Sequence, residues 1–76
     1  MQFQKEAVGA TIRALRQERH LSQEVLSGLA GMARTHLTMI ECGTKQPNLE
    51  TIWRLADAMD LRPSELVQRI EQHTTE

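Results

Sequence analysis

Apolar residues recur along the chain at spacings of three and four, which is the period of amphipathic helices. No stretch alternates apolar and polar positions with a period of two, and β-branched and aromatic residues are sparse. The pattern therefore predicts an all-α fold with five helices. The expected apolar stripes are Val8, Ile12 and Leu15; Leu26 and Ala30; Leu37 and Ile40; Leu49, Ile52, Leu55, Ala56 and Met59; and Leu66 and Ile70.

Residues that cap or interrupt helices give the expected boundaries. The first helix should run from about Gln4 to Arg19, with His20 near the turn, and the last should begin at Pro63 and fray from about residue 72. In between, we expect helices from Ser22 to Gly31, from Ala33 or Arg34 to Gly43, and from Asn48 as N-cap to about Asp60.

Along the chain, the second and third expected helices are short and joined by a tight turn, so residues 22–42, approximately, are predicted to form a helix-turn-helix. In the later helix of this motif, Leu37 and Ile40 form the apolar stripe that faces the core, and the other side chains therefore point outward. A helix that projects in this way fits the major groove of B-DNA, about 12 Å wide. The pattern thus predicts a sequence-specific DNA-binding protein.

Composition adds bounds to this prediction. Seventy-six residues suffice for one small domain, expected to span residues 1–76. The net charge of −1 is unusual for a nucleic-acid binder and argues against the prediction unless charge is segregated. The basic residues do cluster in sequence, at Arg13, Arg16, Arg19 and His20, and at Arg34 and Lys45.

Other functional classes find little support. The one cysteine, Cys42, allows no internal disulfide, and no Cys/His cluster has the spacing of a zinc site, so we expect no metal. No catalytic constellation or phosphate-binding loop is evident, so we expect neither an enzyme nor a cofactor or small-molecule ligand. With no secretory leader and no long apolar run, the expected location is the cytoplasm, on the nucleoid and away from membranes.

Three segments, VGATIRALRQERHLSQ, GMARTHLTMIECG and QPNLETIWRLADAMDLRPSEL, resemble the phage-repressor and Cro type of helix-turn-helix protein, the Xre family. The Arg-Thr pair at the start of the recognition helix and the following Asn-containing loop are most similar to the short controller proteins of restriction-modification systems. The resemblance implies a lambda-repressor-like fold and a homodimer on a palindromic operator, acting on transcription. A prophage repressor, a Cro-like protein, an antitoxin, or an interaction module without DNA binding remain alternatives.

Candidate DNA contacts lie on both helices of the motif and in the loop that follows. The resemblance implies that Gln23 holds a phosphate, aided by the positive end of its helix. Arg34 can donate two hydrogen bonds to the edge of a guanine, or it can bind a phosphate. Lys45 suits a phosphate contact, and Asn48 suits one alongside its capping role. The remaining expected DNA contacts on the recognition helix are Thr35, His36, Thr38 and Met39.

Two further groups of residues have expected structural roles. The resemblance implies a partly buried ion pair between Arg16 and Glu41 that ties the first helix to the recognition helix. Trp53 is either an ordinary core residue or part of a dimer contact together with Leu61, Leu66 and Ile70.

The chain departs from the family pattern at five positions, which are Val25, Ser27, Gly28, Leu29 and Ala33. The Ser27 hydroxyl needs a partner, Gly28 weakens its helix, and Ala33 stands where a capping Ser or Thr is usual. Val25 and Leu29 are four residues apart and are expected to form an exposed apolar pair. A toxin would use such a surface, and RNA polymerase is a further conceivable partner.

Overall fold

The computed structural model describes residues 2–74, and every regular element in that range is a helix. The five helices are α1 (Lys5–Glu18), α2 (Gln23–Ala30), α3 (Arg34–Glu41), α4 (Leu49–Ala58) and α5 (Pro63–His73). This confirms the all-α prediction and the number of helices. None of these helices is both long and apolar enough to cross a membrane.

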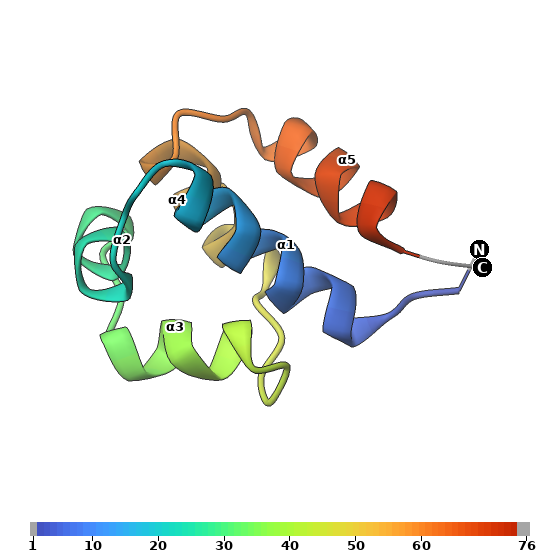
Figure 1. The fold of residues 1–76 in the computed structure, drawn as a ribbon, viewed down its shortest axis with the longest axis horizontal. Coiled ribbons are helices and arrows are strands. Elements are labelled where there is room, and N and C mark those ends of the chain that lie inside the picture. The colour runs from blue at the N-terminus through green and yellow to red at the C-terminus, as the bar shows by residue number, and fades with distance from the viewer. Residues whose placement is uncertain (1, 75–76) are drawn as a thin grey trace.

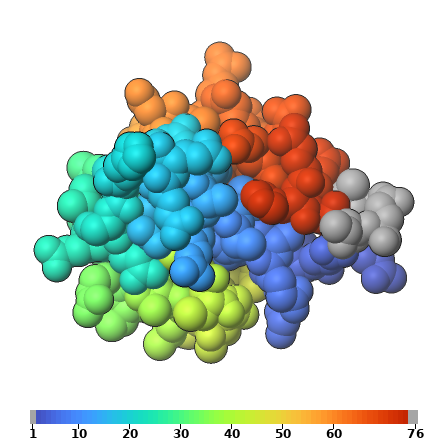
Figure 2. All heavy atoms as spheres, in the orientation of Figure 1, coloured from blue at the N-terminus to red at the C-terminus, as the bar shows by residue number. Residues whose placement is uncertain are grey.

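Helix α1 lies in the middle of the molecule, between α5 on one side and α3 on the other (Figure 1). Helix α2 packs against α3 and α4, and α4 in turn packs against α5. As a result α3 forms an outer edge, and α5 covers the opposite side of α1 (Figures 1 and 2). One side of α3 is therefore not covered by the other helices.

The predicted apolar stripes meet in one core. Side chains of all five helices contribute to it, and Ile12, Leu15, Leu37 and Leu55 are fully buried. Leu49 is the exception: it is 67% exposed, because it stands in the first turn of α4, before that helix reaches the core. Its placement on the predicted apolar face was wrong.

Most predicted caps are present. The Ser22 Oγ accepts a hydrogen bond from the Val25 amide at 3.0 Å, and the Asn48 Oδ1 accepts one from the Thr51 amide at 2.8 Å. Gly31 directly follows α2 and Gly43 stands two residues after the end of α3; both take left-handed conformations, with φ of 68° and 82°. Ala33 precedes α3 without any side-chain cap, as predicted.

The C-terminal helix α5 continues to His73, so Gln72 and His73 of the tail predicted to fray are helical in the structure, while residues 75–76 lie outside the described range. Fraying of this last turn stays a prediction. The buried Thr11 Oγ1 lies 2.7 Å from the His73 Nδ1 and also donates to the Ala7 carbonyl oxygen at 2.6 Å. This contact joins α1 to the last turn of α5.

Candidate nucleic-acid interface

The turn between α2 and α3 is tight because Gly31 adopts a left-handed conformation. The Met32 amide then donates to the Ser27 carbonyl oxygen at 2.9 Å, which closes the end of α2. Ser27 is buried, and its hydroxyl donates to the Glu24 carbonyl oxygen at 3.0 Å, which is the partner that it requires. The helix-turn-helix predicted for residues of about 22–42 is therefore present.

A buried ion pair anchors α3 to α1. The Arg16 guanidinium binds Glu41 at two points, with Nε 2.7 Å from Oε2 and Nη2 3.0 Å from Oε1. The side chains are 11% and 3% exposed, respectively. Arg16 also donates from Nη1 to the Leu21 carbonyl oxygen at 2.8 Å, which holds the chain just before α2. The ion pair implied by the family resemblance is thus confirmed, and it orients both helices of the motif.

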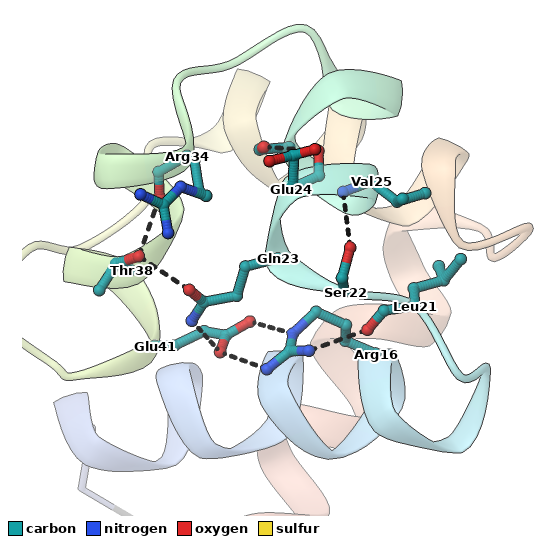
Figure 3. A network of polar contacts seen from close by, with 10 residues as sticks. Arg16, Leu21, Ser22, Gln23, Glu24, Val25, Arg34, Thr38 and Glu41 are labelled. Carbon is teal, nitrogen blue, oxygen red and sulfur yellow. Dashed lines mark hydrogen bonds and ion pairs between the residues drawn. The ribbon is translucent and has the colours of Figure 1, made fainter.

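The ion pair continues into a polar network that reaches the outer face of α3 (Figure 3). Gln23, the first residue of α2, donates from Nε2 to the Glu41 Oε1 at 2.9 Å. Its Oε1 accepts a hydrogen bond from the Thr38 Oγ1, also at 2.9 Å. The structure therefore links two predicted DNA contacts, Gln23 and Thr38, to each other and to the ion pair, a connection that sequence spacing did not suggest.

The other predicted contacts on α3 lie around this network. Arg34 and Thr35 are exposed in its first turn, Met39 is 41% exposed, and His36 is half-buried. Lys45 lies just beyond the helix, and its amide donates to the Met39 carbonyl oxygen at 3.2 Å. Within residues 2–74, neither the Arg34 guanidinium nor the Lys45 ammonium has a carboxylate partner.

The predicted capping role of Asn48 is confirmed, and its phosphate contact stays a prediction. Its Oδ1 accepts hydrogen bonds from the Thr51 amide and hydroxyl, both at 2.8 Å, and so caps α4. Its Nδ2 has no partner among the described residues. The amide hydrogens therefore remain available to an acceptor such as a phosphate oxygen.

Of the four basic residues clustered near the end of α1, Arg16 and Arg19 are engaged within the protein, whereas Arg13 and His20 are exposed. Arg16 is bound to Glu41, and Arg19 donates to the Met59 carbonyl oxygen at 2.8 Å and to that of Leu15 at 3.2 Å. Arg13 remains exposed, beside a shallow groove that also borders Cys42. The structural role expected of Arg16 is thus present, and Arg19 has a comparable one, because both guanidinium groups already donate to acceptors within the protein.

The predicted dimer residues do not form one surface. Leu66 is completely buried in the core, so its assignment to a dimer interface was wrong. Leu61 and Ile70 are partly buried against the same core. Trp53 is 57% exposed, which excludes the interpretation of Trp53 as a core residue.

Sequence reasoning missed two exposed apolar neighbours of Trp53. Leu49 and Val67 are 67% and 49% exposed, and together with Trp53 and Pro63 they line a groove between α4 and α5. We call these four residues the α4–α5 apolar face. Val67 directly follows the buried Leu66, and consecutive residues of a helix point in different directions. This spacing could have shown from the sequence that Val67 does not face the core. The predicted apolar pair on α2 is confirmed, with Val25 and Leu29 49% and 62% exposed.

Comparison with known proteins agrees with this geometry. The HTH_3 helix-turn-helix family model matches residues 12–66. The HTH-type transcriptional regulator y4dL of Sinorhizobium fredii is 34% identical over 61 residues, 80% of this chain and 31% of that protein. The ImmF control region 10 kDa protein of Bacillus phage phi105 is 39% identical over 54 residues, 71% of this chain and 60% of that protein. The chain thus spans about a third of the first relative and three fifths of the second.

Among solved structures, the restriction-modification controller protein C.AhdI from Aeromonas hydrophila superimposes with a TM-score of 0.77 at 38% sequence identity. The match covers 80% of this chain and 92% of the controller. The family model covers more than half of the chain and includes α2, α3 and the Arg16–Glu41 pair that orients them. The chain belongs to the HTH_3 helix-turn-helix family.

Proposed function

We propose that this protein binds operator DNA sequence-specifically as a homodimer, with α3 of each copy in a major groove. One observation carries the proposal: α3 is fixed from behind by the buried Arg16–Glu41 pair, while its first turn presents Arg34 without any carboxylate partner in residues 2–74. A rigid helix with a free guanidinium at its entry suits the bidentate recognition of a guanine edge.

The surrounding residues would position the helix on the phosphate backbone. Gln23 has a second Nε2 hydrogen that is not used by Glu41, and Lys45 and the Asn48 Nδ2 lie beyond the other end of α3. Phosphate contacts set register and orientation, whereas base contacts set sequence preference. We assign the first role to Gln23, Lys45 and Asn48. The second falls to residues of α3, namely Arg34, Thr35, His36, Thr38 and Met39.

The α4–α5 apolar face is the proposed contact between two copies. Several large apolar side chains that lie exposed beside one another are typical of protein interfaces. Tryptophan, as at Trp53, is also enriched at the centres of such interfaces. A two-fold dimer would place its recognition helices about 34 Å apart, so that each reads half of an inverted repeat. Because only the dimer binds both half-sites, promoter occupancy depends steeply on protein concentration. Regulation of this kind needs no small-molecule effector.

Two regulatory settings have support from the comparisons. The similarity to C.AhdI supports a restriction-modification controller, and the similarity to the ImmF control region protein of phage phi105 supports a prophage regulator. The exposed pair Val25 and Leu29 offers a protein contact, for RNA polymerase or for a toxin, in either setting. Neighbouring genes would separate these settings, since a restriction enzyme, a prophage or a toxin would be encoded beside the regulator.

The test is selection of bound fragments from a random duplex library, eluted at two salt concentrations. We expect an inverted repeat that is still enriched at the higher salt concentration, because base contacts survive the screening that weakens phosphate attraction. Arg34→Ala should lose the enrichment. Arg69→Ala is the matched control: it removes the same charge from α5, on the opposite side of α1, and breaks only a surface ion pair to Glu18 at 3.2 Å.

A protein-interaction module that has lost DNA binding is the second candidate, favoured by the net charge of −1 and by the apolar pair on α2. It predicts weak, salt-sensitive DNA binding with no enriched sequence. It also predicts that Arg34→Ala combined with Lys45→Ala leaves partner binding intact, whereas the DNA-binding proposal predicts that this double variant no longer binds the operator.

A further inference from the structure

The hydroxyl of Thr38 occupies a special place in the polar network (Figure 3). Thr38 is half-buried on α3, three residues after Thr35 and four after Arg34, so it shares a helix face with both. A threonine hydroxyl has one hydrogen to donate and two lone pairs that accept. What it can offer to DNA depends on where that hydrogen already points.

The direction of the hydrogen bonds in the network starts at Glu41. Its carboxylate is bound to the Arg16 guanidinium and has only acceptors to offer on its remaining side. Gln23 must therefore turn its Nε2 toward the Glu41 Oε1, at 2.9 Å, since the opposite orientation would place two acceptors against each other. The Gln23 Oε1 is then left facing Thr38.

The same reasoning applies to the next bond. The Gln23 Oε1 can only accept, so the hydrogen between it and the Thr38 Oγ1, 2.9 Å away, belongs to Thr38. The other polar neighbour of this hydroxyl is the Arg34 carbonyl oxygen at 3.0 Å, which is also an acceptor. Whichever oxygen takes the hydrogen, it is used inside the protein. Thr38 has only lone pairs and a methyl group left for a partner.

We propose that Thr38 is a specificity-determining residue that accepts a hydrogen bond from the exocyclic amine of adenine or cytosine, and that Glu41 acts through Gln23 as the positioning residue. The inference rests on the proposed function. In the major groove adenine and cytosine present amine donors, whereas guanine O6, thymine O4 and the phosphate oxygens are acceptors. An acceptor-only Thr38 bonds the first group and not the second.

Thr35 provides the contrast within the same helix. Its side chain is exposed, and among the described residues its hydroxyl has no hydrogen-bond partner. That hydroxyl can rotate to donate or to accept, so it is not restricted to amine-bearing bases. Two threonines on one face of α3 therefore differ in what they can read, although their side chains are identical.

The test begins with operator selection by the wild-type protein and by Thr38→Val, Thr38→Ser and the control Arg69→Ala, with helicity and melting temperature measured for each. Thr38→Val removes the hydroxyl and keeps the shape, whereas Thr38→Ser keeps the hydroxyl. We expect one position of each half-site to prefer adenine or cytosine in the wild type, in Thr38→Ser and in Arg69→Ala, and to lose that preference in Thr38→Val.

The second step removes the amine itself, by replacing that base with its analogue lacking the exocyclic amine. Loss of one hydrogen bond should weaken binding about 2- to 10-fold for the wild type and for Thr38→Ser. The change should be less than about 2-fold for Thr38→Val, which has no acceptor to lose. Such a pattern places the amine and the Thr38 oxygen in contact.

Other outcomes overturn the inference. A preference for guanine or thymine that depends on the Thr38 hydroxyl would show that its hydrogen is free. An unchanged preference in folded Thr38→Val would show that Thr38 does not read a base. If the wild-type protein enriches no sequence, the proposed function itself fails. Failure of the Thr38 inference alone is different, because the wild-type protein then still enriches an operator.

Glu41→Gln tests the positioning step separately. An amide nitrogen in place of the Glu41 Oε1 gives up the contact from the Arg16 Nη2 but can donate to Gln23. The Gln23 amide can then reverse and donate to Thr38, which leaves one Thr38 lone pair instead of two for the base amine. We expect the folded variant to show a smaller penalty for the missing amine than the wild type. An undiminished penalty would remove Glu41 from the proposal, and the Thr38 variants decide the rest if Glu41→Gln does not fold.

Discussion

Gly9 lies where α1 crosses the end of α3, and replacing it with alanine should destabilise the protein. A Cβ atom built on Gly9 would stand 2.7 Å from the Glu41 carbonyl oxygen and nearer still to that of Ile40. Both are backbone atoms of α3, so no side chain can rotate away to make room. The two helices would have to separate, and the Arg16–Glu41 pair spans the same contact.

Gly28 offers the matched control, because it is also a glycine inside a helix. A Cβ on Gly28 would meet nothing within 4 Å. Gly28→Ala should therefore stabilise the protein by about 0.5–1 kcal/mol through helix propensity alone. Gly9→Ala has the same gain, but overpacking costs up to about 3 kcal/mol, so the expected net loss is about 2 kcal/mol.

Thermal unfolding followed by circular dichroism measures both effects. For a domain of this size 1 kcal/mol corresponds to about 4–8 °C, so Gly9→Ala should melt about 8–16 °C lower and Gly28→Ala about 2–8 °C higher than the wild type. A melting temperature of Gly9→Ala equal to or above that of the wild type would refute the reasoning, since it would mean that α1 and α3 do not approach so closely in solution.

Three further predictions concern the ion pair, a missing cap and the dimer face. Arg16→Ala strands the buried Glu41 carboxylate and should cost roughly 3–5 kcal/mol in urea unfolding; a loss below about 1 kcal/mol would indicate that the pair is solvated. Ala33→Ser adds the side-chain cap that α3 lacks and should raise stability by about 1 kcal/mol, whereas no gain would show that the α3 amides are already satisfied. Trp53→Ala should shift the sedimentation coefficient from dimer to monomer with unchanged helicity, because the side chain is 57% exposed in the protomer; an unchanged dimer would exclude the α4–α5 apolar face.

Local patterns of the chain predicted the helices well. The apolar stripes of α1, α2 and α3 are buried as expected, and Ser22, Asn48 and the left-handed Gly31 and Gly43 mark helix ends where their chemistry places them. These features depend on neighbours within one or two helical turns, so they can be inferred from spacing alone. Local patterns failed for Leu49, and they gave no sign of the contact between Thr11 and His73, 62 residues apart in sequence, which joins α1 to the last turn of α5.

By itself, the sequence determined that the fold is all-α, that a helix-turn-helix begins at Ser22, and that polar residues cover the outer face of its second helix. Only the tertiary structure decided which polar groups are free. Arg16 and Arg19 are engaged inside the protein and Arg34 is not, and the Thr38 hydroxyl donates inward while that of Thr35 has no partner in residues 2–74. The physical reason is that a hydrogen bond uses up a donor or acceptor, and its partner can come from a helix distant in sequence.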